Sequence, residues 1–421
     1  MTNGMTSAYR AMRGYPLIIF LACLLTWTLA NMDQSLFGYA IPALQEEFAA
    51  SLDAISWILF WSFVVGAFMS VGLGIAADRY GRRIMLVLAL AGSALLVGLH
   101  AMAPTLVLLA ILRALAFGLS NGLPAITNTY VVEASPQRYR GVMMGLLQCG
   151  YPLGWFLASI FAVPLMSLYG WRSIFLMALV VVPLAFLIGR WLPESKRFAA
   201  EKAERANNPR QGPWFSNVKT LFEPKLRRTT LLISLAFFSY GGAYAGTAFY
   251  FPTFYTEVRG YSIETATTIV GLSYGIGVIG YISSAVIGEF YLTRRNTTVI
   301  WNWLGALALV GLIWIPTTFA ADVFWFSLMA TFFYGSNAVI ATLLTESFPT
   351  RVRATGAAFA GTFAMNLGFA IFPVLVAKIV ALVGWQWAFT IAVVPSLFLC
   401  GLALLGLDNV RSGLDLDEIA R

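Results

Sequence analysis

The stretch GIAADRYGRR, residues 74–83, separates two apolar runs, residues 54–77 and 84–103, each long enough to cross a membrane. About 20 consecutive apolar residues span a bilayer as an α-helix. Gly81 permits a tight turn, the arginines hold the loop on the cytoplasmic side, and Asp78 needs a partner at the membrane edge. The stretch therefore predicts two membrane helices joined by a short cytoplasmic turn.

The composition of the whole chain excludes a water-soluble fold. Of its 421 residues 59% are hydrophobic and 11% charged, whereas soluble domains are about 45–50% apolar and about 25% charged. The sequence predicts an all-α membrane protein, because its apolar residues fall into twelve runs: 16–41, 54–77, 84–103, 105–132, 141–169, 172–192, 229–256, 264–289, 297–318, 322–345, 354–379 and 385–407.

The basic residues set the expected orientation. Nearly all of the 27 lysines and arginines lie at the termini, in the long connection after the sixth run, or in the loops on the same side. Since basic loops stay in the cytoplasm, both termini are expected there. The net charge of +8 is thereby explained by membrane topology and lipid contact, and nucleic-acid binding is not expected.

Two motifs occur twice, once in each half of the chain. EASPQRYRG begins at Glu133 and ESFPTRVRATG at Glu346, while GWRSIF begins at Gly170 and GWQWAF at Gly384. A duplication of six spans is typical of transporters, whose substrate site lies midway across the bilayer between the repeats. We expect two pseudo-symmetric six-helix bundles, residues 1–192 and 229–421, joined by a cytoplasmic linker, residues 193–228.

The stretch at residues 74–83 closely resembles the cytoplasmic signature of the major facilitator superfamily. The resemblance implies that this loop helps to close the cytoplasmic side, with Glu133 pairing with Arg140 and Glu346 with Arg353. The alternative is that these charges only anchor loops and set topology. The expected gating residues are Asp78, Arg79, Arg82, Arg83, Glu133, Arg140, Glu346 and Arg353.

Two charges lie inside predicted spans. Asp33 is the only acid within the first, and Arg113, in RALAFGLSNG, belongs to a segment that looks like the fourth-span motif of the same superfamily. Each lies about 13 Å deep at about 1.5 Å per residue, and an arginine at a span centre costs roughly 2.5–3.5 kcal/mol. We expect both to face one water-filled cavity and to interact, directly or through water. The alternative is a structural ion pair, although desolvation makes such pairs poor stabilisers.

Polar and aromatic side chains in the middle of other spans are the expected cavity lining, although such rings also serve packing and interface belts. Together they suit a flat organic anion. The expected substrate-binding residues are Gln34, Asn121, Asn128, Gln148, Tyr151, Trp155, Tyr244, Tyr274, Tyr334, Asn337 and Asn366.

The segment GLPAITNTYVVEASPQRYRGVMMGLLQCGYPLG, residues 122–154, resembles bacterial proton symporters for organic acids of the aromatic-acid and sialate types. This resemblance implies a monomer in the bacterial inner membrane that imports an aromatic or other monocarboxylate with protons, and needs no cofactor. A proton-coupled exporter of amphipathic compounds is the alternative. A sensor without transport is disfavoured because the linker is too short for a signalling domain. No nucleophile, metal cluster or phosphate loop suggests an enzyme.

Overall fold

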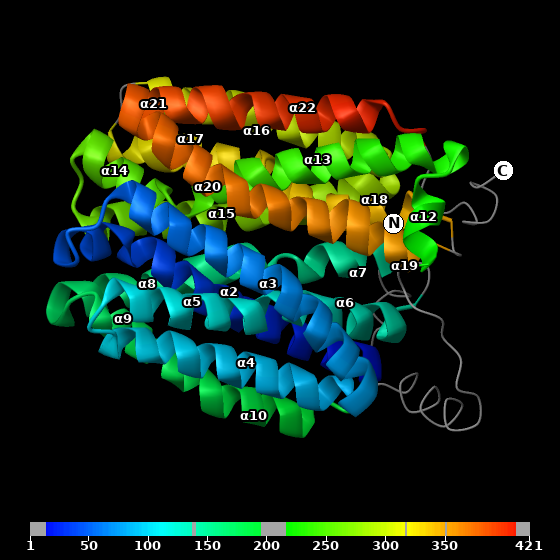
Figure 1. Ribbon diagram of the computed structural model, residues 1–421, viewed down its shortest axis with the longest axis horizontal. Helices are drawn as coiled ribbons and strands as arrows, with labels where there is room; N and C mark the ends of the chain where they lie inside the picture. The colour runs from blue at the N-terminus through cyan, green and yellow to red at the C-terminus, as the bar shows by residue number, and fades with distance from the viewer. Residues whose placement is uncertain (1–13, 137–139, 195–215, 316–317, 350–351, 410–421) are drawn as a thin grey trace.

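The computed structural model of the chain is a bundle of long helices, described at residues 14–136, 140–194, 216–315, 318–349 and 352–409 (Figure 1). These residues form helices and connections without any strand. Within the described residues, twelve helical segments are long and apolar enough to cross a membrane. The twelve spans expected from the sequence are therefore confirmed, with ends that differ by a few residues.

The first six spans occupy one side of the bundle and the last six the other (Figure 1). The helices of the first six are α2 (Tyr15–Glu47), α3 (Leu52–Tyr80), α4 (Arg82–Leu99), α5 (Leu106–Asn121) with α6 (Leu123–Ala134), α7 (Arg140–Leu147) with α8 (Gly150–Tyr169), and α9 (Arg172–Met177) with α10 (Val181–Trp191). The short helices η1 (His100–Met102) and η3 (Ala178–Val180) extend the third and sixth spans.

The last six spans follow a short helix, α12 (Ser216–Leu221). They comprise α13 (Pro224–Ala248) with α14 (Phe251–Arg259), α15 (Ile263–Phe290), α16 (Arg294–Trp314), α17 (Phe319–Phe332) with η4 (Tyr334–Ser336) and α18 (Asn337–Glu346), α19 (Arg353–Gly356) with η5 (Ala357–Phe363) and α20 (Ala364–Val383), and α21 (Trp385–Ala388) with η6 (Phe389–Val393) and α22 (Val394–Leu405).

One end of the bundle holds the start of α2, the short helix α12 and the end of α22 (Figure 1). We call this the linker end. The turn predicted at Gly81 lies between α3 and α4, where Gly81 has a φ of 112°, a conformation that side chains with a Cβ rarely adopt. Hydroxyl side chains start several other spans; Ser51, for example, accepts a hydrogen bond from the backbone N–H of Ala54 at 3.1 Å, as helix N-caps do.

Three spans are broken near their middle, which exposes backbone groups there. The fourth breaks at Gly122, just before Pro124, the fifth at Gln148 and Cys149, and the tenth at η4. Proline lacks the N–H that would continue the helix. Broken backbone is tolerated at membrane depth only where protein or cavity water satisfies it, so these breaks mark the inside of the bundle.

The first and sixth spans of each half are joined at the end opposite the linker. The indole N–H of Trp171 donates to the Glu47 carboxylate at 2.5 Å, and the indole N–H of Trp385 donates to the Glu257 carboxylate at 2.7 Å. The two tryptophans occupy the same place in the repeated motifs GWRSIF and GWQWAF. Each half therefore carries the same contact between its first and last helix.

The packing of α15 on α17 leaves no room for a side chain at Gly280. An added Cβ would lie 1.9 Å from the backbone carbonyl oxygen of Thr331, and overpacking of this kind costs about 1–3 kcal/mol. We expect Gly280→Ala to lower the thermal unfolding temperature in detergent. The control is Gly72→Ala on α3, where no heavy atom lies within 4 Å and alanine favours a helix by about 1 kcal/mol. Equal unfolding temperatures for the two variants would contradict the close contact.

Candidate functional site

Arg113 lies on α5 in the interior of the bundle, with 1% of its surface exposed. Its Nη1 atom donates a hydrogen bond to Oε1 of Gln34 on α2 at 2.6 Å. The guanidinium carbon lies 4.6 Å from the ring centre of Phe37, 5.5 Å from that of Phe117 and 5.7 Å from that of Phe249. Arginine cations are attracted to aromatic faces at such distances, so three rings and one amide hold this charge.

One edge of the same guanidinium has no partner. The Nε and Nη2 atoms of Arg113 are buried and form no hydrogen bond with any residue that the structure describes. Those two N–H groups point in parallel from one side of a planar fork, the geometry that matches the two oxygens of a carboxylate. Arg113 can therefore bind an anion through these two N–H groups while it keeps its hydrogen bond to Gln34.

The structure does not form the expected direct contact between Asp33 and Arg113. Asp33 is fully buried, and neither of its carboxyl oxygens has a hydrogen-bond partner among the described residues. Successive residues on a helix point about 100° apart, and on α2 it is Gln34 that faces α5. The expected interaction is therefore not formed as a direct contact in this conformation, because Gln34 and not Asp33 faces α5; an interaction through water stays a prediction.

The expected aromatic lining residues lie together where the two halves meet. The rings of Trp155 on α8 and Tyr274 on α15 stack at 4.9 Å, and Tyr274 stacks on Tyr334 at 5.3 Å with an angle of 4° between the planes. Tyr151 in the first turn of α8 packs against Tyr244 on α13 at 5.0 Å. The structure brings these five rings into contact with one another; their contact with a substrate stays a prediction.

The expected amide residues are more scattered. Nδ2 of Asn121, at the end of α5, donates to Oδ1 of Asn366 on α20 at 3.3 Å, a hydrogen bond between the two halves. Gln148 is buried at the break of the fifth span, and Asn128 and Asn337 are half-buried. The structure brings Asn121 and Asn366 together and leaves the other three apart from them.

Charged residues at the linker end form ion pairs within each half. Arg82 pairs with Glu133, and Arg294 pairs with Glu346. Arg294 also contacts Glu289 at 2.5 Å. Both arginines follow a turn between consecutive spans, as GRR at 81–83 and TRR at 293–295, so the two halves again use equivalent residues.

The expected partnership of Glu133 with Arg140 is wrong. Arg140 forms no ion pair with any described residue, and its buried Nε has no hydrogen-bond partner, because Arg82 reaches Glu133 from the neighbouring helix α4. Arg79 is exposed and lies 5.4 Å from the ring centre of Tyr80, while the backbone N–H of Arg83 faces Glu194 at 3.4 Å. The side chains of Asp78 and Arg353 lie outside the described part of the structure.

The halves touch each other at both ends of the bundle. At the linker end, a Cβ added to Gly141 would lie 2.5 Å from a Glu289 oxygen, and one added to Gly145 would lie 2.6 Å from the Cβ of Ala285. At the opposite end, Nζ of Lys378 approaches the Asp53 carboxylate at 3.9 Å. Arg113 and Asp33 are therefore enclosed between two zones of contact.

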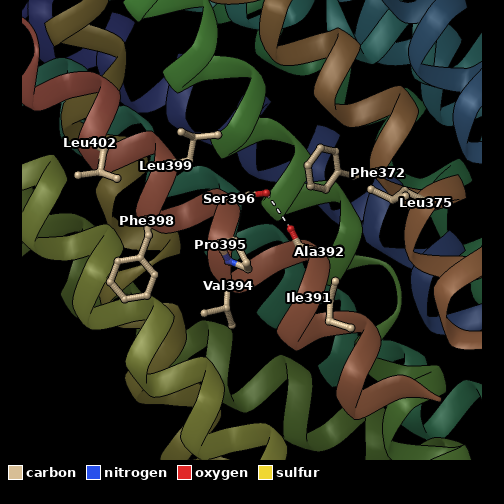
Figure 2. A pocket seen from close by; sticks show the side chains of 10 residues that line it. All are labelled: Phe372, Leu375, Ile391, Ala392, Val394, Pro395, Ser396, Phe398, Leu399 and Leu402. Carbon is tan, nitrogen blue, oxygen red and sulfur yellow. Dashed lines mark hydrogen bonds between the residues drawn. The ribbon is translucent and has the colours of Figure 1, made fainter. Parts of the chain in front are cut away.

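An apolar groove of about 730 Å³ lies on the outer face of the second half, between α20 and η6–α22 (Figure 2). Its one polar side chain, Ser396, donates a hydrogen bond to the carbonyl oxygen of Ala392 at 2.7 Å. Leu402 in its wall is 58% exposed. The groove offers no free polar group, so it suits lipid chains and does not suit a charged solute.

A family comparison agrees with this architecture. Residues 23–365 match the family model described as Major Facilitator Superfamily. The chain belongs to this superfamily. It is accordingly a multi-pass membrane transporter and not an enzyme, and the family resemblance inferred from residues 74–83 is confirmed.

Two transporters and one solved structure illustrate what this chain is similar to. The cis,cis-muconate transport protein of Acinetobacter baylyi is 27% identical over 85% of this chain and 86% of its own length. The 3-(3-hydroxy-phenyl)propionate transporter of Escherichia coli is 26% identical over 93% of each chain. A bacterial homolog of the human lysosomal transporter Spinster, inward-facing and unoccupied, has a TM-score of 0.62 at 16% identity, covering 93% of this chain and 95% of its own, which shows the shared fold.

Sequence reasoning missed two of the rings around Arg113. Phe37 lies three residues after Gln34 on α2, and helical spacing could have indicated it. Phe249 lies at the junction of α13 and α14 in the other half, and no sequence signal links it to Arg113.

Proposed function

We propose that this transporter imports a small organic anion, an aromatic or other monocarboxylate, together with protons by alternating access. The observation that carries the proposal is the unpaired Nε–Nη2 edge of the buried Arg113. A carboxylate there would form two charge-assisted hydrogen bonds, and the rings of Phe37, Phe117 and Phe249 would contact its apolar part. The names of the relatives that transport cis,cis-muconate and 3-(3-hydroxy-phenyl)propionate support an acid as substrate.

Asp33 is the proton carrier in this proposal. Its carboxyl group is fully buried without a partner among the residues described, and an ionised carboxylate in that position would be costly. The closed conformation thus favours a neutral Asp33, and opening to water on either side allows the proton to leave. A carboxylate bound at Arg113, one helix away, disfavours a second anion nearby and so couples its own entry to that of the proton.

The proposal also includes the orientation of the chain in the membrane, its oligomeric state and the parts that move. The linker end faces the cytoplasm of a bacterium, the chain acts as a monomer in the inner membrane, and residues 1–192 and 229–421 move as two bundles joined by residues 193–228. The basic residues near the linker end support this orientation. Protons are the only coupling ion, and lipid and substrate are the only partners.

A larger side chain placed where the two halves touch at the linker end tests alternating access. Gly145 on α7 contacts Ala285 of α15, and Cys149, one turn further on, is 5% exposed. Since overpacking costs about 1–3 kcal/mol, Gly145→Leu is expected to raise the labelling rate of Cys149 by a membrane-impermeant thiol reagent at least about fivefold. Labelling is measured in inside-out vesicles with Cys23→Ser and Cys400→Ser in the background.

The control for Gly145→Leu is Gly72→Leu on α3, where no heavy atom lies within 4 Å of an added Cβ. An unchanged labelling rate in a folded Gly145→Leu protein would show that this contact does not hold the linker end closed.

The experiment that tests the function is substrate-driven acidification. The protein is reconstituted in liposomes that contain a pH-sensitive dye, and benzoate, hydroxybenzoates, 3-(3-hydroxyphenyl)propionate, muconate and aliphatic acids are added outside. Acidification of the interior by one class of monocarboxylate, absent from protein-free liposomes, is the expected result. If no acid moves protons inward while a neutral or cationic amphiphile moves them outward, the exporter replaces this proposal.

A further inference from the structure

Five tyrosines of the second half, Tyr240, Tyr244, Tyr274, Tyr281 and Tyr334, lie close together and form what we call the tyrosine cluster. The rings of four of them are in contact: Tyr240 with Tyr244 at 6.2 Å, Tyr244 with Tyr334 at 4.8 Å, and Tyr274 with Tyr334 at 5.3 Å. Tyr281 lies two turns from Tyr274 on α15, a spacing that places both on the same helix face. Each of the five is at least nine-tenths buried.

The hydroxyl groups of the tyrosine cluster are largely unused. Tyr334 pairs with the Thr247 hydroxyl at 3.0 Å. The hydroxyls of Tyr244 and Tyr281 are buried and have no hydrogen-bond partner among the residues described, and those of Tyr240 and Tyr274 also form no hydrogen bond within 3.5 Å. A buried polar group left unpaired costs about 1–3 kcal/mol. Phenylalanine, which fills neighbouring positions such as Phe333, would pack here without that cost.

The tyrosine cluster is connected to Arg113 by an unbroken series of aromatic contacts. The Arg113 guanidinium carbon lies 5.7 Å from the ring centre of Phe249. Phe249 lies 5.8 Å from Trp155, and Trp155 stacks on Tyr274 at 4.9 Å. A flat molecule anchored at Arg113 by a carboxylate would therefore extend along these rings toward the tyrosine hydroxyls.

We infer that the tyrosine cluster is a second polar subsite, which binds an uncharged hydrogen-bonding group, such as a hydroxyl or a carbonyl, at the end of the substrate opposite its carboxylate. The inference rests on the proposed function of Arg113 as the carboxylate site. Tyrosine hydroxyls both donate and accept hydrogen bonds, so they suit a neutral group of either kind.

The distribution of charge in the second half disfavours a second carboxylate at this subsite. From residue 229 onward, basic residues occur only at the ends of spans or after the last span: Arg259, Arg294, Arg295, Arg351, Arg353, Lys378, Arg411 and Arg421. A second anion at the tyrosine cluster would thus be buried without a cation, which is costly. The site selects a hydroxylated or oxygenated monocarboxylate over both an unsubstituted acid and a dicarboxylate.

Matched pairs of acids test this inference in the reconstituted protein. Initial uptake is compared for benzoate with 3- and 4-hydroxybenzoate, for 3-phenylpropionate with 3-(3-hydroxyphenyl)propionate, and for muconate as a dicarboxylate. We expect the wild type to prefer the hydroxylated member of at least one pair by about tenfold, because a site with unpaired polar groups rejects an analogue that lacks the matching group.

Removal of single hydroxyls then locates the subsite. Tyr244→Phe or Tyr281→Phe is expected to reduce the preference about tenfold, toward equal uptake of the two acids, because each change removes a hydroxyl and keeps the ring. The control is Tyr255→Phe. The Tyr255 hydroxyl is also buried without a hydrogen-bond partner among the described residues, but Tyr255 lies on α14, outside the tyrosine cluster, and its ring packs with those of Phe251 and Phe326.

Three results would overturn the inference. These are a wild type that transports both members of every pair equally, cluster variants that lower the uptake of both acids to the same extent, and a Tyr255→Phe variant that changes the preference as much as Tyr281→Phe does. A protein that transports none of these acids would instead overturn the proposed function itself, and the second subsite with it.

Discussion

Arg113→Lys is expected to lower the initial rate of carboxylate uptake by about 10- to 100-fold, which corresponds to roughly 1.4–2.8 kcal/mol. The variant keeps the positive charge and removes the planar fork. The lysine ammonium group is a compact point charge. It cannot donate to Gln34 and at the same time form two parallel hydrogen bonds to a carboxylate. Losing charge-assisted hydrogen bonds costs about 1.5–3 kcal/mol, in agreement with the expected fall.

The effect of Arg113→Lys should appear mainly as weaker substrate binding. The measurement is uptake of labelled acid as a function of concentration in liposomes, with thermal unfolding as a check on folding. Arg227→Lys is the matched control, since Arg227 is exposed near the start of α13 and its change should leave uptake within about twofold. Wild-type kinetics in the Arg113→Lys protein would remove Arg113 from the substrate site.

Asp33→Asn is expected to abolish substrate-driven acidification while exchange of labelled for unlabelled substrate continues. Asparagine has nearly the same shape as a protonated aspartic acid and cannot release a proton. The closed conformation, in which Asp33 is buried without a partner, should therefore form as readily in the variant. Exchange requires only the loaded carrier to reorient, whereas net import requires the proton to leave.

The two assays separate coupling from folding in the Asp33→Asn protein. Loss of both exchange and acidification would indicate a structural role for Asp33, and persistence of acidification would place the proton elsewhere. Asp408→Asn is the control, because Asp408 is an exposed acid just after α22. Its replacement should leave both assays unchanged.

The fold was predictable because its main signals are local. Twelve apolar runs give twelve spans, Gly81 gives the turn between α3 and α4, and Pro124 indicates the broken fourth helix. The depth of Asp33 and Arg113 can be estimated from the sequence, because the rise per residue of a helix is fixed, and this depth stays a prediction. Sequence spacing thus sets where a residue lies along the membrane normal.

The pairings inside the bundle were not predictable to the same extent. Whether Asp33 or Gln34 meets Arg113 depends on the rotation of α2 about its axis, which is decided by packing against several helices at once. The partner of Glu133 likewise comes from another helix, and only the equivalent positions of Arg82 and Arg294 after their turns could have indicated it. Phe249 reaches Arg113 across the interface between halves, a contact that depends on the conformation of the whole transporter.

The contacts of Trp171 with Glu47 and of Trp385 with Glu257 have a consequence for biosynthesis. Each contact joins the first and the last helix of one half, so it forms only once all six have been inserted. Since domains fold as units during synthesis, the amino-terminal one first, we expect the first half to close on itself once residue 191 has entered the membrane, before the second half is made. The order of translation would then assemble two finished bundles that afterwards need only to dock.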